Sequence, residues 1–400
     1  MMLITFVTRL RNFLKVKINN MINIYQPSLG DDELKVIEDV FKSNWLGYGR
    51  QGKYQDEFIK NFSAMLIDTD MSTVSSDNLL TISSCSEALF QSIESYVNEG
   101  DEVIIPSINF VAASNAVIYK KAKPVFCDVN PRTLNVELKH IEPYVTNKTV
   151  AIIVIHYAGV PCDIENILKF CKENNIKLIE DNANSPFSRV NGKNTGTFGD
   201  MGLWSFDPMK VITTGDGGVI YCKDTDLLKE IKYRTYLGLK SSGSSNPVDK
   251  KWWEFDVTFP GSKYTMNDIS AAIGVAQLKK VSEFMSIRKH IHKTYNSELS
   301  KIDWLQTPND IPSDNLSSYY MYHIQLETES DRNELAKYLR ENDIYTTFRY
   351  YPLHWVKYYK SKQSLPNAEY AANHTLNIPI HQSLSDDDVS LVIEKIKSYK

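Results

Sequence analysis

Two residues in this sequence have the types and the setting for Schiff-base chemistry. Lys210 lies in the glycine-rich run SFDPMKVITTGDGG, residues 205–218, and a strand-like segment upstream ends in an acid, Leu178-Ile179-Glu180-Asp181. A lysine amine forms a Schiff base with an aldehyde, and a carboxylate keeps a pyridine nitrogen protonated. These are the two groups that pyridoxal phosphate (PLP) chemistry needs. Because most lysines are solvated surface charges, this interpretation depends on the elements around Lys210.

The order of the elements predicts a layered α/β domain. From Met21 onward, short apolar strands alternate with helical segments such as 31–42 and 54–65, which favours a largely parallel, seven-stranded sheet flanked by helices. Strands are expected at residues 79–82, 102–105, 124–128, 150–155, 177–181, 202–205 and 218–221. Ligands of such sheets gather at the carboxyl ends of the strands, and several polar or aromatic residues fall there: Ser84, Phe110, His156, Asp181 and Ser205.

The last third of the chain has a different pattern. A helical stretch over 267–295 is expected to link the large domain to a smaller α+β domain, with strands at 319–326 and 344–349 and helices at 331–342 and 386–398. The sequence therefore predicts three parts: a basic N-terminal extension (1–20), a large cofactor-binding domain (21–265), and a linking helix with a small C-terminal domain (266–400).

A helix start near residue 85 is the candidate phosphate site. In the run Ser84-Cys85-Ser86-Glu87, the Ser86 side chain and the following amides are expected to face a phosphate, which the helix dipole favours. The alternative is that Ser86 only caps the helix. Phe110 could lie flat on a planar cofactor or be a core aromatic, and Asp181 could be a solvated strand-end carboxylate or a helix cap. Ser205 adds a hydroxyl five residues before Lys210.

Together these segments resemble the fold type I PLP enzymes, and most closely the DegT/DnrJ/EryC1/StrS family of nucleotide-sugar aminotransferases. The resemblance runs from about Asn23 to the C terminus, and the lysine turn with its upstream Glu-Asp pair is its most specific part. The other matching blocks are SNWLGYG (43–49), PSINFVAASNAV (106–117), YTMNDISAAIG (264–274) and YPLH (351–354).

The resemblance implies a role for each matching residue. It implies that Lys210 forms the Schiff base with PLP, that Asp181 forms a salt bridge to the pyridine nitrogen, and that Phe110 stacks on the ring. It also implies a phosphate cradle made by Ser205 and the amides of Ser86 and Glu87. Family members share active sites across a homodimer, so Lys263 is expected to reach the phosphate of the neighbouring subunit.

Several positions depart from the family pattern. The glycine and threonine usual at the cradle are Cys85 and Ser86, and the Gln or His usual three residues after the aspartate is Asn184. Asn184 is still able to hydrogen-bond the ring oxygen of the cofactor. Lys263 stands where the family has an asparagine, and Thr265 where it has an arginine. These departures concern the phosphate and the substrate more than the cofactor.

The implied reaction is a ping-pong transfer of an amino group from glutamate to a nucleotide-linked keto sugar, expected to be a 4-keto-6-deoxy sugar used for surface polysaccharide or related glycans. The run Ile212-Thr213-Thr214-Gly215 looks more like C4 than C3 aminotransferases. His354, Arg349 and Tyr351 are candidate substrate contacts, with a structural role as the alternative for Arg349 and Tyr351.

Three other functions are kept as alternatives. A sugar 3-dehydratase of the same family carries histidine in place of the lysine, so Lys210 argues against it. Amination of a small phosphorylated ketone would need no nucleotide pocket. A non-catalytic, membrane-associated partner in glycan assembly is suggested by the N-terminal extension alone.

Composition excludes several further classes. A net charge of −4 over 400 residues gives no whole-chain electrostatic case for nucleic acid. Five scattered cysteines without a Cys-x-x-Cys pair fit reduced thiols in a cytoplasmic protein, and they predict no metal site. The sequence contains no run of about 18 apolar residues, so it predicts no membrane span.

Residues 1–20 carry four basic residues and no acid. Their apolar residues repeat at helical spacing, so a basic amphipathic helix that contacts a membrane is one interpretation. The favoured interpretation is an extension outside the fold, because Met21 directly precedes a strand-like segment.

Overall fold

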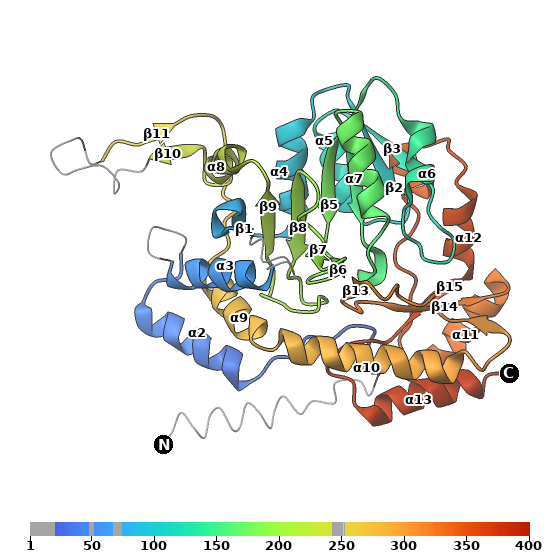
Figure 1. Ribbon diagram of the computed structural model, residues 1–400. Coiled ribbons are helices and arrows are strands. Elements are labelled where there is room, and N and C mark those ends of the chain that lie inside the picture. Colours follow the sequence, from blue (N-terminus) through green and yellow to red (C-terminus); the bar gives the residue numbers. More distant parts are fainter. Residues whose placement is uncertain (1–20, 48–51, 67–73, 242–250, 252) are drawn as a thin grey trace, which may run out of the picture.

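The computed structural model describes residues 21–47, 52–66, 74–241, 251 and 253–400 (Figure 1). The predictions for residues 1–20 lie outside this part of the chain. Within the described ranges, no helix is both long enough and apolar enough to cross a membrane.

A seven-stranded sheet forms the centre of the molecule, in the order β1-β9-β8-β5-β4-β2-β3. Its strands are β1 (Leu79–Ile82), β2 (Glu102–Pro106), β3 (Lys123–Cys127), β4 (Thr149–Ile155), β5 (Lys177–Asp181), β8 (Met201–Ser205) and β9 (Gly218–Cys222). The pairings among β3, β2, β4, β5 and β8 are parallel, which confirms the largely parallel sheet. β9 runs antiparallel to both of its neighbours, β8 and β1.

The antiparallel β9 follows from the short connection before it. Residues 206–217 join β8 to β9 without a helix, and a parallel return would need a crossover that carries the chain back along the sheet. The turn with Lys210 therefore stays at the carboxyl edge of β8.

Helices cover both faces of this sheet (Figure 1). On one face pack α4 (Cys85–Tyr96), α5 (Val111–Tyr119) and α8 (Thr225–Arg234). On the other face, α6 (Leu138–Ile141) and α7 (Ile164–Glu173) cover β2, β4 and β5, while α3 (Lys53–Met65) and α9 (Asp268–Leu278) cover β1, β8 and β9. α2 (Asp31–Ser43) packs on α9. Since both faces are covered, the central strands are apolar on both sides.

A second, smaller core lies in the C-terminal part. It contains the antiparallel strands β12 (Leu305–Gln306), β14 (Tyr322–Leu326) and β15 (Thr375–Ile378). The helices of this part are α10 (Val281–Leu299), α11 (Glu329–Glu341), α12 (Pro366–His374) and α13 (Asp386–Lys397). Ile22 packs into this core and bridges Ile344, whereas α9 packs with α2 and α3. The division into domains at 265/266 stays a prediction.

Two smaller sheets complete the described part. Strands β6 (Arg189–Val190), β7 (Lys193–Asn194) and β13 (Asn315–Leu316) form one, which joins the two cores. Strands β10 (Leu239–Ser241) and β11 (Asp256–Val257) pair in an arm that projects from the large sheet (Figure 1).

Two predicted elements are wrong in the C-terminal part. The expected helix over 267–295 is two helices, α9 and α10, which separate at Lys279 and Lys280. The expected strand over 344–349 makes only isolated bridges, at Ile344 and Thr347. Its Arg349 N–H donates at 2.8 Å to the side chain of Asn377 in β15 and not to a backbone carbonyl.

Candidate active site

The lysine turn is held in a compact conformation at the end of β8. Phe206 N–H donates to the Gly217 carbonyl at 3.0 Å, and Lys210 N–H donates to the Asp207 carbonyl at 2.9 Å. Gly218 has to be a glycine because a Cβ there would lie 2.9 Å from the Cys85 nitrogen. The exit of the turn therefore passes directly against the start of α4.

Asp181 ends β5, the strand beside β8, and its side chain is buried with 2% exposure. The Ala183 N–H donates to its Oδ1 at 2.9 Å. Burial raises the pKa of Asp181, and the Ala183 hydrogen bond and the charges of Lys210 and His156 partly offset this rise. Asp181 and the Lys210 turn thus lie at one edge of the sheet, after the neighbouring strands β5 and β8, within range for the Lys210 charge to lower the pKa of Asp181.

Its neighbour Glu180 points to the opposite face and has a structural role. Its carboxylate accepts hydrogen bonds from the backbone of Gly196, Phe198 and Gly199 at 2.7–2.8 Å, and lies 3.2 Å from His156 Nε2. Glu180 therefore fixes the loop before β8, which leaves Asp181 as the acid at the site.

Phe110 and Asn184 are connected at this edge by a second aromatic residue, Tyr350. The Phe110 ring is 47% exposed and lies 5.9 Å from the Tyr350 ring. The Tyr350 hydroxyl donates to Asn184 Oδ1 at 3.1 Å. The buried Asn184 Nδ2 has no hydrogen-bond partner among the described residues, so one amide donor of this side chain remains for a ligand.

The start of α4 provides the candidate phosphate cradle. The Ser84 side chain caps the helix by accepting a hydrogen bond from Glu87 N–H at 3.2 Å. The alternative interpretation, in which Ser86 is the cap, is therefore wrong. Ser86 and Glu87 lie in the first turn and are half-buried. The Ser205 end of β8 pairs with Gly218, beside Cys85. The cofactor roles of Ser86, Glu87 and Ser205 stay predictions.

The candidate substrate residues lie in different settings. Both ring nitrogens of His354 have partners, with Ser107 Oγ 2.6 Å from Nδ1 and Glu369 3.2 Å from Nε2. Arg349 is half-buried over the Tyr25 ring, and Tyr351 is 60% exposed. The structure therefore gives His354 a framework contact, while Arg349 and Tyr351 have surface available to a ligand.

Lys263 does not join the Lys210 cluster within one chain. Its side chain is exposed, and its backbone bridges Tyr236. The next residue, Tyr264, accepts a hydrogen bond from Ser83 N–H at 2.8 Å, which places this loop beside the start of α4. A contact between Lys263 and a partner subunit's phosphate stays a prediction.

Sequence analysis missed Tyr320 and Tyr25. The Tyr320 hydroxyl lies 3.4 Å from Lys210 Nζ, and its ring stacks on Tyr25 with the centroids 5.1 Å apart. No local motif marks either tyrosine, because they lie 110 residues after and 185 residues before Lys210 in the chain.

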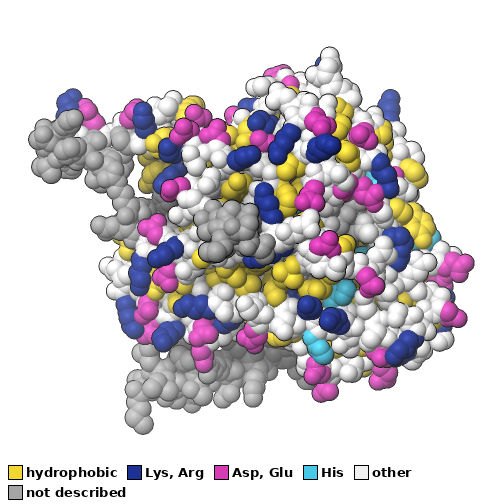
Figure 2. All heavy atoms as spheres, viewed as in Figure 1, with side chains coloured by type: hydrophobic (Ala, Val, Ile, Leu, Met, Phe, Trp, Pro, Cys, Tyr) yellow, Lys and Arg dark blue, Asp and Glu magenta, His cyan; other side chains and the backbone are white. Residues whose placement is uncertain are grey.

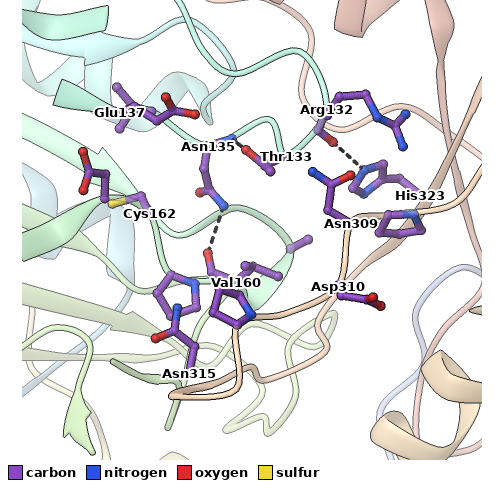
Figure 3. A pocket seen from close by; sticks show the side chains of 16 residues that line it. Arg132, Thr133, Asn135, Glu137, Val160, Cys162, Asn309, Asp310, Asn315 and His323 are labelled. Atoms are coloured by element: carbon purple, nitrogen blue, oxygen red, sulfur yellow. Dashed lines mark hydrogen bonds between the residues drawn. The ribbon is translucent and has the colours of Figure 1, made fainter. Parts of the chain in front are cut away.

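Two cavities have neither Tyr25 nor Tyr320 among their lining residues. One of about 310 Å³ lies between large-domain loops and the C-terminal core, with Arg132, Asn135, Asp310 and His323 among its lining residues (Figure 3). The other, of about 490 Å³, is lined by Glu87, Gly261 and Ser262 among others. The described residues contain no cluster of three His, Cys, Asp or Glu side chains able to hold a metal ion.

The sheet is mostly parallel and covered by helices, with a lysine on the turn after β8 and a buried carboxylate at the end of the neighbouring strand, β5. This is the architecture of a fold type I PLP enzyme. The side chains fit this cofactor: Lys210 offers an amine, Asp181 an acid, and Asn184 a donor without a partner.

Comparison with known proteins gives the family. The sequence model of the DegT/DnrJ/EryC1/StrS aminotransferase family matches residues 27–397, and the chain belongs to this family. It is therefore an enzyme, a PLP-dependent aminotransferase, which confirms the resemblance, the fold class and the cofactor predicted from the sequence. The alternative of a non-catalytic partner is set aside.

Several relatives match over nearly the whole chain. The chain is 39% identical to the dTDP-4-dehydro-2,3,6-trideoxy-D-glucose 4-aminotransferase of Saccharopolyspora spinosa, over 94% of this chain and 96% of that protein. It is 33% identical to the GDP-perosamine synthase of Escherichia coli O157:H7, over 94% and 98%. The crystal structure of the aminotransferase TlmJ from Streptoalloteichus hindustanus superposes with a TM-score of 0.89 at 40% identity, covering 95% of this chain and 98% of that one.

Proposed function

We propose that this enzyme transfers an amino group from glutamate to a nucleotide-linked 4-keto-6-deoxy sugar, for surface polysaccharide or related glycan biosynthesis. The observation that carries the proposal is that the Lys210 turn and the buried Asp181 carboxylate lie at one sheet edge, where the Lys210 charge acts on Asp181. The sugar is supported by the relatives, which are named as a dTDP-sugar 4-aminotransferase and as GDP-perosamine synthases.

The residues of the chain divide the chemistry among them. PLP, when bound, supplies an electron sink for the carbon that loses its proton. Asp181 would keep the ring nitrogen protonated, because a carboxylate buried away from water is stabilised by a positive charge next to it. Phe110 would cover one face of the ring, and the free amide hydrogen of Asn184 would donate to the ring oxygen.

Lys210 is the proposed general base and acid. Its Nζ takes the α proton from the amino donor in the first half-reaction, and in the second it returns a proton to the carbon of the acceptor. The keto acid leaves before the sugar binds, so both substrates use the same site in turn.

The proposed sugar-nucleotide contacts come from residues 349–354. The half-buried Arg349 guanidinium would offer a fork of hydrogen bonds to a diphosphate, and Tyr351, two residues later in the chain, has an exposed hydroxyl-bearing ring. His354, whose two nitrogens bond to Ser107 and Glu369, would contribute by holding this segment in place.

The test is product mass spectrometry with PLP, glutamate and a panel of nucleotide-linked keto sugars. We expect an amino-sugar product from wild type with a 4-keto-6-deoxy substrate, and a loss of at least about 10³-fold in Lys210→Ala, because no other side chain replaces the amine. Turnover only with small phosphorylated ketones would favour that alternative. Normal turnover by Lys210→Ala would overturn the assignment.

We also propose that the enzyme works as a homodimer with shared active sites. Large apolar side chains are exposed along α2 and on the arm, at Leu34, Phe41, Phe255 and Val257. Hydrophobic side chains also gather near the centre of the face in Figure 2, with charged ones around them. Surfaces of this kind favour association with a second copy.

Mixing two inactive variants tests the shared site. Lys210→Ala and Lys263→Glu are each expected to lose activity, and after unfolding and refolding together they should regain it at about a quarter of the sites, because half of the dimers are mixed and each has one complete site. A mixture as inactive as its parts would contradict a role for Lys263 across the interface.

A further inference from the structure

A tyrosine from the C-terminal part contacts the amine of Lys210. The Tyr320 hydroxyl lies 3.4 Å from Lys210 Nζ, and Nζ lies 4.8 Å from the centre of the Tyr320 ring. Tyr320 precedes β14 and is fully buried. The amine is thus held by a residue from outside the large sheet.

Three contacts fix Tyr320 in this position. Its ring stacks on Tyr25 with an interplanar angle of 8°. Its N–H donates to the Ala158 carbonyl at 3.0 Å, and its carbonyl accepts from Arg288 Nη1 at 3.3 Å. A stacked ring with both backbone groups bonded has little rotational freedom, so the hydroxyl position is defined.

Arg288 of α10 connects this tyrosine to the lysine turn. Its buried guanidinium donates to the carbonyls of Tyr319, Tyr320 and Ile380 and to the Gln382 side chain. Gln382 in turn donates to the carbonyl of Val211, the residue after Lys210, at 3.2 Å. One buried side chain therefore positions both the backbone beside Lys210 and the hydroxyl in front of it.

The Tyr320 hydroxyl stays protonated in the working range. Burial raises the pKa of Tyr320 to about 12, although the nearby charges of Arg349 and Arg288 act to lower it. A neutral phenol is both a donor and an acceptor, so it can donate to a neutral amine and accept from an ammonium group.

We propose that Tyr320 is a positioning residue for Lys210. The Tyr320 hydroxyl holds Lys210 Nζ in place whenever the amine is not covalently bound. The inference rests on the proposed function, in which Lys210 moves a proton. While Nζ is neutral, the hydroxyl donates to its lone pair, and after Nζ has taken the donor's α proton the same oxygen accepts an N–H. Tyr320 gains and loses no proton over the cycle.

The test compares Tyr320→Phe with a matched control, Tyr322→Phe. Tyr322 is also fully buried, lies two residues further along, and donates to Asn296 at 2.7 Å, away from the lysine. In single-turnover reactions of the PLP-loaded enzyme with glutamate, we expect Tyr320→Phe to slow the half-reaction about 10- to 100-fold, because the base is no longer oriented. The glutamate concentration for half-maximal rate should change less than about twofold, since no donor contact is lost.

A second measurement does not need turnover. In cofactor-free protein, reductive methylation of Lys210 by formaldehyde and cyanoborohydride, followed by peptide mass spectrometry, reports how freely Nζ reacts. We expect faster labelling in Tyr320→Phe than in wild type, and wild-type labelling in Tyr322→Phe. Equal half-reaction rates and equal labelling in the two variants would overturn the proposal.

The two measurements separate the two hypotheses. If glutamate is not the donor, wild type will also fail to react with it, while the labelling comparison still tests the contact between Tyr320 and Lys210. A thermal melt of each variant establishes that it is folded before labelling.

Discussion

At the scale of single residues, burial destabilises the ionised form of the Asp181 carboxylate. Burial raises its pKa, and the Ala183 hydrogen bond, Lys210 and His156 offset only part of that rise. A folded-state pKa above the unfolded value of 3.8 means that the folded protein holds this proton more tightly. The contribution of Asp181 to the unfolding free energy therefore decreases as pH rises through the folded pKa.

Asp181→Asn should separate stability from activity. Without cofactor, we expect the variant to unfold with a free energy about 1–2 kcal/mol higher than wild type at pH 7, because no buried charge remains. This gain should shrink as pH falls towards the unfolded value of 3.8, because the raised pKa lets the folded wild-type acid take up its proton first. With cofactor, turnover should fall about 10²- to 10⁴-fold. Urea unfolding and steady-state kinetics measure the two effects, and a less stable cofactor-free variant would refute the argument.

The sequence was sufficient for some site residues and not for others. Lys210 and Asp181 follow apolar strands, and parallel strands bring their carboxyl ends to one edge, so the placement of both residues at that edge was predictable. Tyr320, Tyr25 and Tyr350 were not, because only tertiary packing brings them to Lys210 and Asn184.

At the scale of elements, one buried acid contacts both sides of the break between α9 and α10. Glu33 of α2 accepts from Gln277 Nε2 and Lys280 Nζ, each at 2.8 Å, and from its own Gly30 N–H. The apolar repeat over 267–295 predicted one helix because the sequence does not show these contacts with residues about 245 positions away. The predicted strand at 344–349 pairs with β15 only at Thr347 and Asn377, because the next ladder donor, the Arg349 N–H, bonds to the Asn377 side chain.

Removing this acid should destabilise the junction of α2 and α9. Burial acts to raise the pKa of Glu33, but the hydrogen bonds from Lys280, Gln277 and Gly30 outweigh it, so the pKa is lowered. We expect Glu33→Ala to lower the unfolding free energy by about 2–4 kcal/mol at pH 7, because two buried donors lose their acceptor. The stabilisation is present above the unfolded pKa of 4.5 and is lost as pH falls through the folded value.

The matched control is Glu38→Ala on the same helix. Glu38 pairs with Lys42 at the surface, where both side chains are 66% exposed, and such pairs contribute little. Chemical denaturation of the two variants at pH 7 and pH 4 gives the comparison. Equal effects of Glu33→Ala and Glu38→Ala would show that the buried contacts do not hold the junction.

At the scale of the whole molecule, three of the buried histidines in the proposed small domain, residues 266–400, have lowered pKa values. Burial lowers the pKa of His292 in α10, His323 in β14 and His381 to about 4 each. Asp310 acts to raise the pKa of His292, and Asp388 that of His381, while Arg132 lies beside His323 and Arg288 beside His381. The two arginine charges lower the histidine pKa as burial does, and burial outweighs the groups that act to raise it: Asp310 at His292, the Arg132 carbonyl at His323, and Asp388 with the Asn23 carbonyl at His381.

Mild acid should therefore open the small domain before the large one. Between the unfolded value of 6.5 and about 4, the unfolded chain binds protons that the folded histidines exclude, so stability falls as pH falls. At pH 5 each histidine should lower the unfolding free energy by about 2 kcal/mol relative to pH 7. Amide hydrogen exchange at pH 7 and pH 5, corrected for intrinsic rates, should show lost protection in α10 and β14 while β4 and α7 stay protected.

A pair of variants on α10 decides whether the histidines cause this effect. His292→Phe keeps a ring between Tyr319 and Tyr322, whose centroids lie 5.2 Å and 5.1 Å from that of the imidazole, but it cannot be protonated. We expect it to reduce the loss of protection at pH 5, whereas His290→Gln, at an exposed position of the same helix, should behave as wild type. Uniform loss of protection across both cores would instead mean that residues 266–400 do not unfold as a separate unit, because a cooperative single body loses all of its protection together.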